Sequence, residues 1–355
     1  MKKLSKKEGV MKLRAFLGLM LLMVAAVSIM GIKSSAFAQA THTIKAQTYA
    51  VEGTVGFQSQ KIAVDRLKAV TRGELVIQLN GSNTVVNDFQ MFEAVKKGIL
   101  DAIHLPGAFA ASIDPGFAVI FSLPGLWDLP RDARIWIEGY GGKDILVRAY
   151  AKHGLQWVGT TMIAAEPIMS KFPIKSLADF KGKKIRTPAG ITSMLFSELG
   201  AKPVPIPGAE LYSAMQTGVV DACEFVTLAE NFHARLHEVS KYVLWPSFHG
   251  PIALVDWVVN KKVWDGLPQH LKEAFTMMVY EADYRYETMS SAADYKALEE
   301  MKKKGLVHTV LPPAEMEKAR TISLKVANQY KAKSELSDEV ITSVVSYLRS
   351  VGRLK

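Results

Sequence analysis

The sequence predicts a two-lobed α/β protein in which each lobe is a mixed sheet flanked by helices and one long helix braces both lobes. Three observations predict this class: strand-like and helix-like segments alternate in two runs, one helix-to-strand joint occurs twice, and one long segment keeps a helical apolar stripe. With 355 residues, 49% of them hydrophobic, the chain is long enough for two cores.

The first 38 residues are typical of an export signal. A basic stretch, "MKKLSKKEGVMKLR", precedes 18 uncharged residues, and Ala36-Phe37-Ala38 has the small-x-small form of a cleavage site. We therefore expect cleavage before Gln39 and an exported protein. The alternative is an uncleaved anchor, because 18 apolar residues can just span a bilayer.

Charge and cysteine content narrow the function classes. The signal carries seven Lys or Arg and one Glu, which is a net charge of +6 out of the formal +10 of the whole chain. The basic character therefore belongs to targeting and does not indicate a nucleic-acid partner. The single cysteine, Cys223, cannot form an internal disulfide.

The first lobe alternates strands and helices, which favours a largely parallel sheet covered on both faces. Its predicted elements are a strand (41–50), a helix that ends at Gly73, a strand (74–80), a helix (87–98) and a strand (99–107). We assign residues 39–163 and about 251–285 to this lobe.

The second lobe repeats the same order of elements. Its predicted elements are a strand (182–189), a helix (190–200), a strand (201–207), a helix (208–218) and a strand (219–226). We assign residues 164–250 and about 286–355, with the C-terminal helices, to this lobe.

The repeated joint reads "AVKKGILDAI" at 94–103 and "AMQTGVVDAC" at 214–223. We interpret it as a sign that both lobes follow one plan, the alternative being a chance match. Ligands of open α/β sheets collect beyond the carboxyl ends of the strands. Two such edges that face each other would form a ligand-binding cleft.

The bracing helix is predicted from Pro268 to Lys304, a run that no other Pro and no Gly interrupts. A helix of this length measures about 55 Å, more than one lobe. The alternative is two shorter helices broken near "TMSSAADY". A strand at 306–311, a helix after Pro312-Pro313 and a last helix from about Ser337 follow.

Catalytic and cofactor motifs are absent from the sequence. It has no Gly-x-Ser-x-Gly, no phosphate loop, no dinucleotide Gly-x-Gly-x-x-Gly, no Cys-x-x-Cys and no His-Glu-x-x-His. His233 and His237 lie four apart, but without a third ligand we interpret them as surface histidines. We predict a binding protein without a cofactor. An exported hydrolase or lyase remains the alternative, because catalytic groups can converge from distant loops.

Arg186 in "KGKKIRTPAG" is the first candidate ligand-binding residue. It ends a predicted strand just before a helix begins, where a guanidinium and free helix N–H groups suit a carboxylate. Glu224 and Phe225 follow the strand of "DACEFV", and Phe109 holds a comparable place in the first lobe. The alternatives are a solvated edge for Arg186, a surface charge for Glu224 and core packing for the two rings.

Three stretches, "SLADFKGKKIRTPAG", "LGAKPVPIPGAELYSAMQTGVVDACEF" and "KYVLWPSFHGPIALVDWVVNKKVWDGLPQHLKEAF", resemble the solute-binding proteins of TRAP (tripartite ATP-independent periplasmic) transporters, the DctP family. The resemblance covers nearly the whole mature chain. It implies a periplasmic-binding-protein-like receptor that closes by a hinge on an organic acid and delivers it to membrane permease subunits. It also implies that Arg186 clamps the ligand carboxylate and that Glu224 and Phe225 line the cleft.

Glu166 departs from the family pattern, because relatives that take dicarboxylates or sialic acid often carry a second arginine there. An acid at this position disfavours a second carboxylate and suits a ligand hydroxyl, an ammonium group or a cation. Some relatives place a metal beside the ligand and have a Glu after the histidine that matches His249; here Gly250 follows. Glu166 and Glu224 alone are thin support for a metal, and we predict none.

The sequence thus predicts a receptor for a monocarboxylate such as a 2-oxo, hydroxy or aromatic acid, with Arg186, Glu166, Phe109, Glu224, Phe225 and His249 at the site. Its expected partners are the acid and the permease, and it meets the membrane only through the permease. A receptor of an ABC importer and a ligand-sensing subunit are the alternatives.

Overall fold

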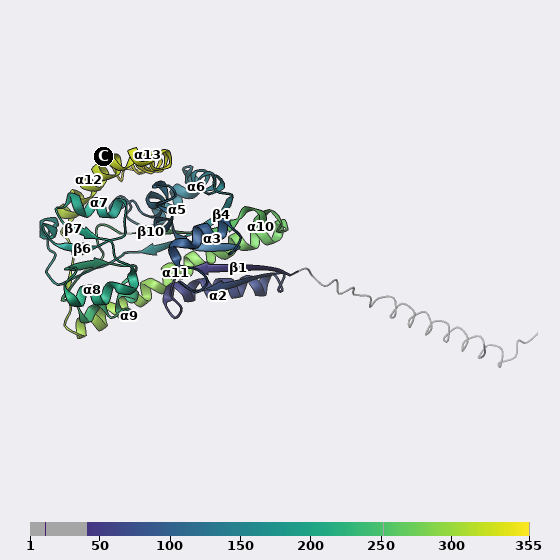
Figure 1. The fold of residues 1–355 in the computed structure, drawn as a ribbon, viewed down its shortest axis with the longest axis horizontal. Coiled ribbons are helices and arrows are strands. Elements are labelled where there is room, and N and C mark those ends of the chain that lie inside the picture. The colour runs from purple at the N-terminus through teal and green to yellow at the C-terminus, as the bar shows by residue number, and fades with distance from the viewer. Residues whose placement is uncertain (1–10, 12–40, 251, 355) are drawn as a thin grey trace, which may run out of the picture. The chain divides into compact units, whose positions relative to one another are not determined.

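The computed structural model describes Met11 and residues 41–250 and 252–354, so the predicted export signal lies outside the described residues. Residues His42–Lys355 belong to one unit, whose strands form two sheets (Figure 1). Each sheet mixes parallel and antiparallel pairs and carries helices on its faces, which confirms the predicted fold class. None of the described helices is both long and apolar enough to cross a membrane.

The first sheet has the strand order β2-β1-β3-β10-β4. Strand β1 runs parallel to β2 and β3, whereas β10 runs antiparallel to β3 and β4. The strands are β1 (His42–Thr48), β2 (Leu75–Asn80), β3 (Ala102–Pro106), β4 (Leu155–Ala164) and β10 (Ile252–Asn260). The sheet and the helices packed on it are called the first lobe below.

Two cores cover the faces of this sheet. One contains α2 and the first half of α11, and the other contains the helices that follow β2 and β3 together with the C-terminal helices. The helices are α2 (Val55–Val70), α3 (Met91–Lys96), α4 (Gly116–Phe121), α5 (Pro130–Gly139), α6 (Gly142–Ala151), α10 (Lys261–Asp265), α12 (Pro313–Tyr330) and α13 (Glu335–Ser350). Helix α13 begins at Glu335, slightly before the predicted start, because the Ser334 side chain accepts from Ser337 N and caps it.

The second sheet has the order β11-β9-β5-β8-β6-β7 and defines the second lobe. Its strands are β5 (Ile168–Ser170), β6 (Lys184–Arg186), β7 (Lys202–Val204), β8 (Ala222–Glu224), β9 (Tyr242–Leu244) and β11 (Val307–Thr309). Helices α7 (Ile191–Glu198) and α12 cover one face, and α8 (Leu211–Thr217) and α9 (Leu228–His233) cover the other. Strand β7 is shorter than predicted and lies at the edge of the sheet. Proline is tolerated there, because Pro203 has no N–H to donate and an edge strand needs partners on one side only.

The repeated joint performs the same task in both lobes. The N–H and Oδ2 of Asp101 pair with the backbone of Lys45 in β1, at 2.9 and 2.8 Å. Those of Asp221 pair with Lys184 in β6, both at 2.8 Å. The strand orders β2-β1-β3 and β7-β6-β8 are also equivalent. These matches support the one-plan interpretation over a chance match.

Helix α11 (Gln269–Lys303) runs unbroken for 35 residues, about 52 Å, so the alternative of two shorter helices is wrong. Residues from Leu271 to Ala282 lie in the core with α2, and residues from Ala297 to Met301 lie in the core with α8 and α9. The helix therefore joins both lobes as predicted (Figure 1).

We expect Asp221→Ala to lower the free energy of unfolding by about 1–2 kcal/mol, because the N–H of Lys184 loses its acceptor. Asp65→Ala, which removes an exposed partner of Lys61, should cost at most about 0.5 kcal/mol. Urea denaturation of both variants measures the difference. Equal losses would contradict a structural role for the joint.

Candidate ligand-binding site

The candidate site lies where the chain passes between the two sheets. Glu166 stands in the crossing from β4 to β5, and His249 stands in the return from β9 to β10. The crossings are bonded to each other: Glu166 N donates to Gly250 O at 2.8 Å, and Ser247 Oγ donates to Glu166 O at 2.6 Å. This pairing places both side chains beside the ends of β6 and β8.

Arg186 and Glu224 end the neighbouring parallel strands β6 and β8. Arg186 Nη1 donates to Glu224 O at 2.7 Å and to Glu224 Oε1 at 3.1 Å, while Nε donates to Ile206 O at 2.9 Å. Only 12% of the arginine side chain is exposed, so it does not lie on a solvated edge. Among the described residues, Nη2 has no hydrogen-bond partner, which leaves it available to a ligand.

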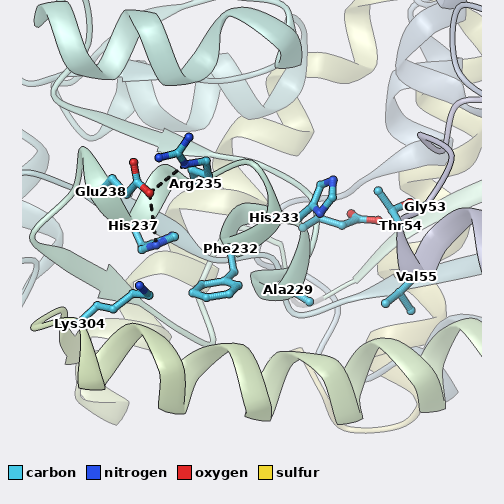
Figure 2. A pocket seen from close by; sticks show the side chains of 11 residues that line it. Gly53, Thr54, Val55, Ala229, Phe232, His233, Arg235, His237, Glu238 and Lys304 are labelled. Carbon is cyan, nitrogen blue, oxygen red and sulfur yellow. Dashed lines mark hydrogen bonds and ion pairs between the residues drawn. The ribbon is translucent and has the colours of Figure 1, made fainter.

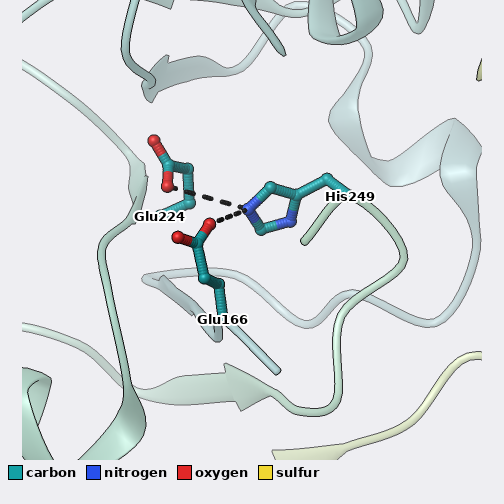
Figure 3. Close-up of side chains that lie close together, drawn as sticks. All are labelled: Glu166, Glu224 and His249. Carbon is teal, nitrogen blue, oxygen red and sulfur yellow. Dashed lines mark ion pairs between the residues drawn. The ribbon is translucent and has the colours of Figure 1, made fainter. Parts of the chain in front are cut away.

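His249 points its ring between two carboxylates (Figure 3). Its Nε2 lies 3.4 Å from Glu166 Oε2 and 3.7 Å from Glu224 Oε2, and all three residues are buried. Within the described part of the chain, this Nε2 makes no hydrogen bond of good geometry. It is therefore held mainly by the charges of the carboxylates.

The hydroxyl of Ser247 shows that Nδ1 of His249 carries a proton. Its single proton is donated to Glu166 O, so at 2.8 Å it must accept from Nδ1–H of His249. A neutral ring would then turn an Nε2 lone pair toward two carboxylates. Burial disfavours the imidazolium, but both carboxylates outweigh burial and raise the pKa of His249.

The two carboxylates differ in charge. Burial raises the pKa of Glu166, and the charge of Glu224 adds to this effect. Burial acts in the same direction on Glu224, but His249 and Arg186 overcome it and lower the pKa of Glu224. With Arg186 and His249 cationic, the group carries a net charge near +1 when Glu166 is protonated and near zero when it is ionised. Such a group suits one carboxylate and not two.

The same three side chains are those that could hold a cation. One ligand atom from each of Glu166, Glu224 and His249 lies within 4.8 Å of the others. Carboxylate oxygens and an imidazole nitrogen suit a divalent ion. The ion would have to displace the Nε2 proton of His249 and compete with Arg186 for Glu224.

Gly250 makes room for the carboxylate of Glu166. A Cβ at residue 250 would lie 2.7 Å from Glu166 Oε2 and 3.0 Å from Glu166 Cβ. A side chain at residue 250 and the present position of Glu166 therefore exclude each other. In this chain the acid therefore comes from residue 166 and not from residue 250.

The two predicted aromatic residues lie in different surroundings. The Phe225 ring centroid is 5.7 Å from Arg186 Cζ, close enough for a cation–π contact. Phe109, in the turn Gly107–Ala110, is half-buried and packs on Phe89 with ring centroids 4.7 Å apart. The structure thus groups Arg186, Glu166, Glu224, Phe225 and His249, and it places Phe109 in the first-lobe core region.

Tyr49 was missed by the sequence reasoning. It follows β1 at the carboxyl end, and its hydroxyl lies 3.2 Å from that of Tyr286 in α11. Burial raises the pKa of Tyr49, with smaller contributions from the charges of Glu230 and Glu166. The rule that pointed to Phe225, a ring just beyond a strand, would also have found Tyr49.

A separate cavity of about 490 Å³ lies between the loop before α2 and the turn after α9 (Figure 2). Thr54, His233 and His237 line it, and none of the grouped site residues does. The interpretation of His237 as a surface histidine is wrong, because only 6% of its side chain is exposed. The turn Leu236–Glu238 directs its ring onto that of Phe232, with ring centroids 4.5 Å apart.

Comparisons with known proteins agree with this architecture. The profile of the family described as bacterial extracellular solute-binding protein, family 7, matches residues 47–333. A monocarboxylate 2-oxoacid-binding periplasmic protein of Nostoc sp. is 25% identical over 286 residues, 80% of this chain and 78% of that protein.

Two crystal structures of TRAP periplasmic solute-binding proteins share the fold. One, from Rhodobacter sphaeroides in an apo open form, has 27% identity and a TM-score of 0.75, covering 88% of this chain and 99% of that chain. The other, from Colwellia psychrerythraea with bound calcium and pyruvate, has 22% identity and a TM-score of 0.80, covering 88% and 95%.

We expect Glu166→Gln to lower the pKa of His249 by about 1–2, because one of its two facing carboxylates is lost. A histidine titration by NMR measures this change. Glu74→Gln, which alters the exposed pair with His270, serves as the control and should leave His249 unchanged. An unaltered His249 titration in Glu166→Gln would contradict the charge assignment.

Proposed function

We propose that this chain, which belongs to the bacterial extracellular solute-binding protein family 7, the solute-binding proteins of TRAP transporters, captures a monocarboxylate in the periplasm and delivers it to permease subunits. Family membership places it among receptors and not among enzymes. The class of ligand, the periplasmic location and delivery to a permease are our proposals.

One observation carries the ligand class: only 12% of the Arg186 side chain is exposed, and its Nη2 has no partner among the described residues. A guanidinium binds carboxylates by charge-assisted hydrogen bonds, and exclusion of water strengthens the pair. Closure of the two lobes by a hinge would exclude that water, as in other periplasmic binding proteins. We infer that Phe225 walls the same pocket and that Phe109 approaches from the first lobe.

Glu166 determines which second polar group of the ligand can be bound beside its carboxylate. When protonated it can donate to a 2-oxo group, and when ionised it can accept from a 2-hydroxyl group. A second carboxylate would meet this acid, which argues against dicarboxylates. The 2-oxoacid named for the Nostoc relative agrees with this proposal.

A cation beside the ligand is the second candidate, favoured by the three ligand atoms within 4.8 Å. Ionised Glu166 and Glu224 would hold it, and it would polarise a ligand oxygen.

The leader, with its basic start, apolar stretch and small-x-small end, supports export to the periplasm for either candidate.

We expect Arg186→Lys to weaken the binding of pyruvate, lactate or benzoate about 10–100-fold, because lysine retains the charge but loses the guanidinium fork. Titration calorimetry with this panel and with malonate measures the effect. Arg235→Lys, at an exposed arginine, is the matched control. Binding of malonate alone, or of none of the panel, would contradict the monocarboxylate class.

Affinity for the monocarboxylate should fall as pH rises through about 7. The pKa of Glu166 is raised from 4.5 to about 7, so the acid is neutral below this pH and repels an anion above it. One proton can change affinity by at most about tenfold per pH unit. Glu166→Gln should remove this dependence.

If a cation is bound beside the ligand, the pH dependence of ligand affinity should have the opposite sign. Cation binding should strengthen as Glu166 ionises, ligand affinity should rise with it, and a chelator should abolish ligand binding. The pH profile with and without chelator therefore separates the two candidates.

A further inference from the structure

One edge of the second sheet carries a row of lysines. Strands β6, β7, β8, β9 and β11 begin at this edge, and β5, which runs the other way, ends there. We call the four lysines at these strand ends the basic rim: Lys171 after β5, Lys183 before β6, Lys202 at the start of β7 and Lys241 before β9. Arg186 and Glu224 lie at the opposite ends of β6 and β8, so the basic rim is separate from the candidate ligand-binding site.

Backbone hydrogen bonds hold the basic rim in one row. Lys241 N donates to the last residue of β5 at 2.9 Å, which places it beside Lys171. Lys171 N donates to Asp221 O, just before β8, at 3.0 Å. Lys202 N donates to Lys183 O at 2.7 Å. Because neighbouring strands lie about 4.8 Å apart, the row from β9 to β7 spans about 19 Å.

The ammonium groups of the basic rim keep their charge exposed to a partner. Among the described residues, none of the four lysines forms a salt bridge, whereas Lys61 and Lys261 each pair with an aspartate at 2.5 Å. Lys202 and Lys241 are exposed, and Lys171 and Lys183 are half-buried. Lys183 Nζ lies 4.8 Å from the ring centroid of Phe172, a contact that favours the cation.

Asp221 is an acid at the same edge, but a fifth lysine offsets it. Asp221 Oδ2 accepts from Lys184 N at 2.8 Å, and Lys184 Nζ donates to Gly218 O at 2.7 Å. The charges of Asp221 and Lys184 therefore cancel within the edge. The four lysines of the basic rim contribute their full positive charge to the surface.

The residue types at this edge favour a diffuse negative surface over one shaped anion. Lysine presents a hydrated point charge on a flexible stem, whereas arginine suits carboxylates and phosphates that are held by two parallel bonds. Protein interfaces favour aromatic residues, Met and Arg at their core and are depleted in Lys. Among the described residues, the large apolar side chains exposed at this edge are Val219 and Val307, which argues against a protein partner.

We propose that the basic rim holds the second lobe against a membrane surface that contains anionic phospholipids. Clusters of about four to eight lysines or arginines attract such surfaces, because each cation adds to the attraction. The candidate ligand-binding site lies at the other ends of the strands, so contact with lipid leaves it free. The proposal takes the periplasmic location from the proposed function and does not depend on which acid the site binds.

Co-sedimentation with vesicles tests the basic rim. The chain from Gln39 onward is used, because the predicted export signal would itself bind lipid, and this chain includes the whole compact unit His42–Lys355. Vesicles of phosphatidylcholine are compared with vesicles of equal parts phosphatidylcholine and phosphatidylglycerol. The anionic vesicles should bind more protein, and less of it as salt rises to about 0.15 M, where charges are screened beyond about 8 Å.

Exchange of all four rim lysines for glutamine should lower the affinity for anionic vesicles about tenfold or more. The matched control removes the same net charge at four exposed lysines on other elements: Lys68→Gln, Lys143→Gln, Lys296→Gln and Lys333→Gln. The control should bind the vesicles nearly as strongly as the unchanged protein. Calorimetry with pyruvate should give both variants the ligand affinity of the unchanged protein, and failure of that ligand class would leave the vesicle result as it stands.

The proposal is wrong if the unchanged protein does not prefer anionic vesicles, or if the rim variant and the control lose binding equally. A rim variant that binds vesicles normally but imports its ligand more slowly in cells would also overturn it and would assign the basic rim to an acidic face of the permease. Should the fourfold variant melt well below the control, Lys202→Gln combined with Lys241→Gln decides, because both side chains are exposed.

Discussion

Four ionisable side chains, gathered at two strand ends and at the paired crossings between the sheets, constrain the rest of the site. A buried ion is costly unless partners satisfy it, and here Arg186 pairs with Glu224, whereas His249 Nε2 has no hydrogen-bond partner among the described residues. The strand ends supply the first two, and the paired crossings supply His249 and Glu166. An anion could complete this set or a cation could share it, which is compatible with the solute-binding family to which the chain belongs.

Much of the fold could be predicted because its signals are local. Glycine-ended helices, alternating strands and the duplicated Asp101 and Asp221 joints are encoded in short stretches, and they predicted the order of elements along the chain in both lobes. The start of α13 and the shortness of β7 were not predicted, because caps and edge positions depend on neighbours. The packing of α13 against first-lobe helices could not be read locally, since it depends on contacts between distant segments.

The candidate residues other than Phe109 lie together, but their electrostatic arrangement was not predicted. Arg186 and Glu224 were found because both end strands, yet their mutual bond was not foreseen. The proton on Nδ1 of His249 is assigned from one hydroxyl, that of Ser247, which donates to a residue 81 positions away in the sequence. Likewise, nothing local shows that Gly250 and Glu166 share one volume. Such facts arise from the crossing geometry and appear only in three dimensions.

Helix α11 adds a mechanical consequence. One end is embedded in the core with α2 and the other in the core with α8 and α9, and no break lies between them. Relative motion of the lobes must therefore flex this rod or slide one end through packed side chains. The unbroken helix therefore couples the two cores mechanically and would limit how far they could separate.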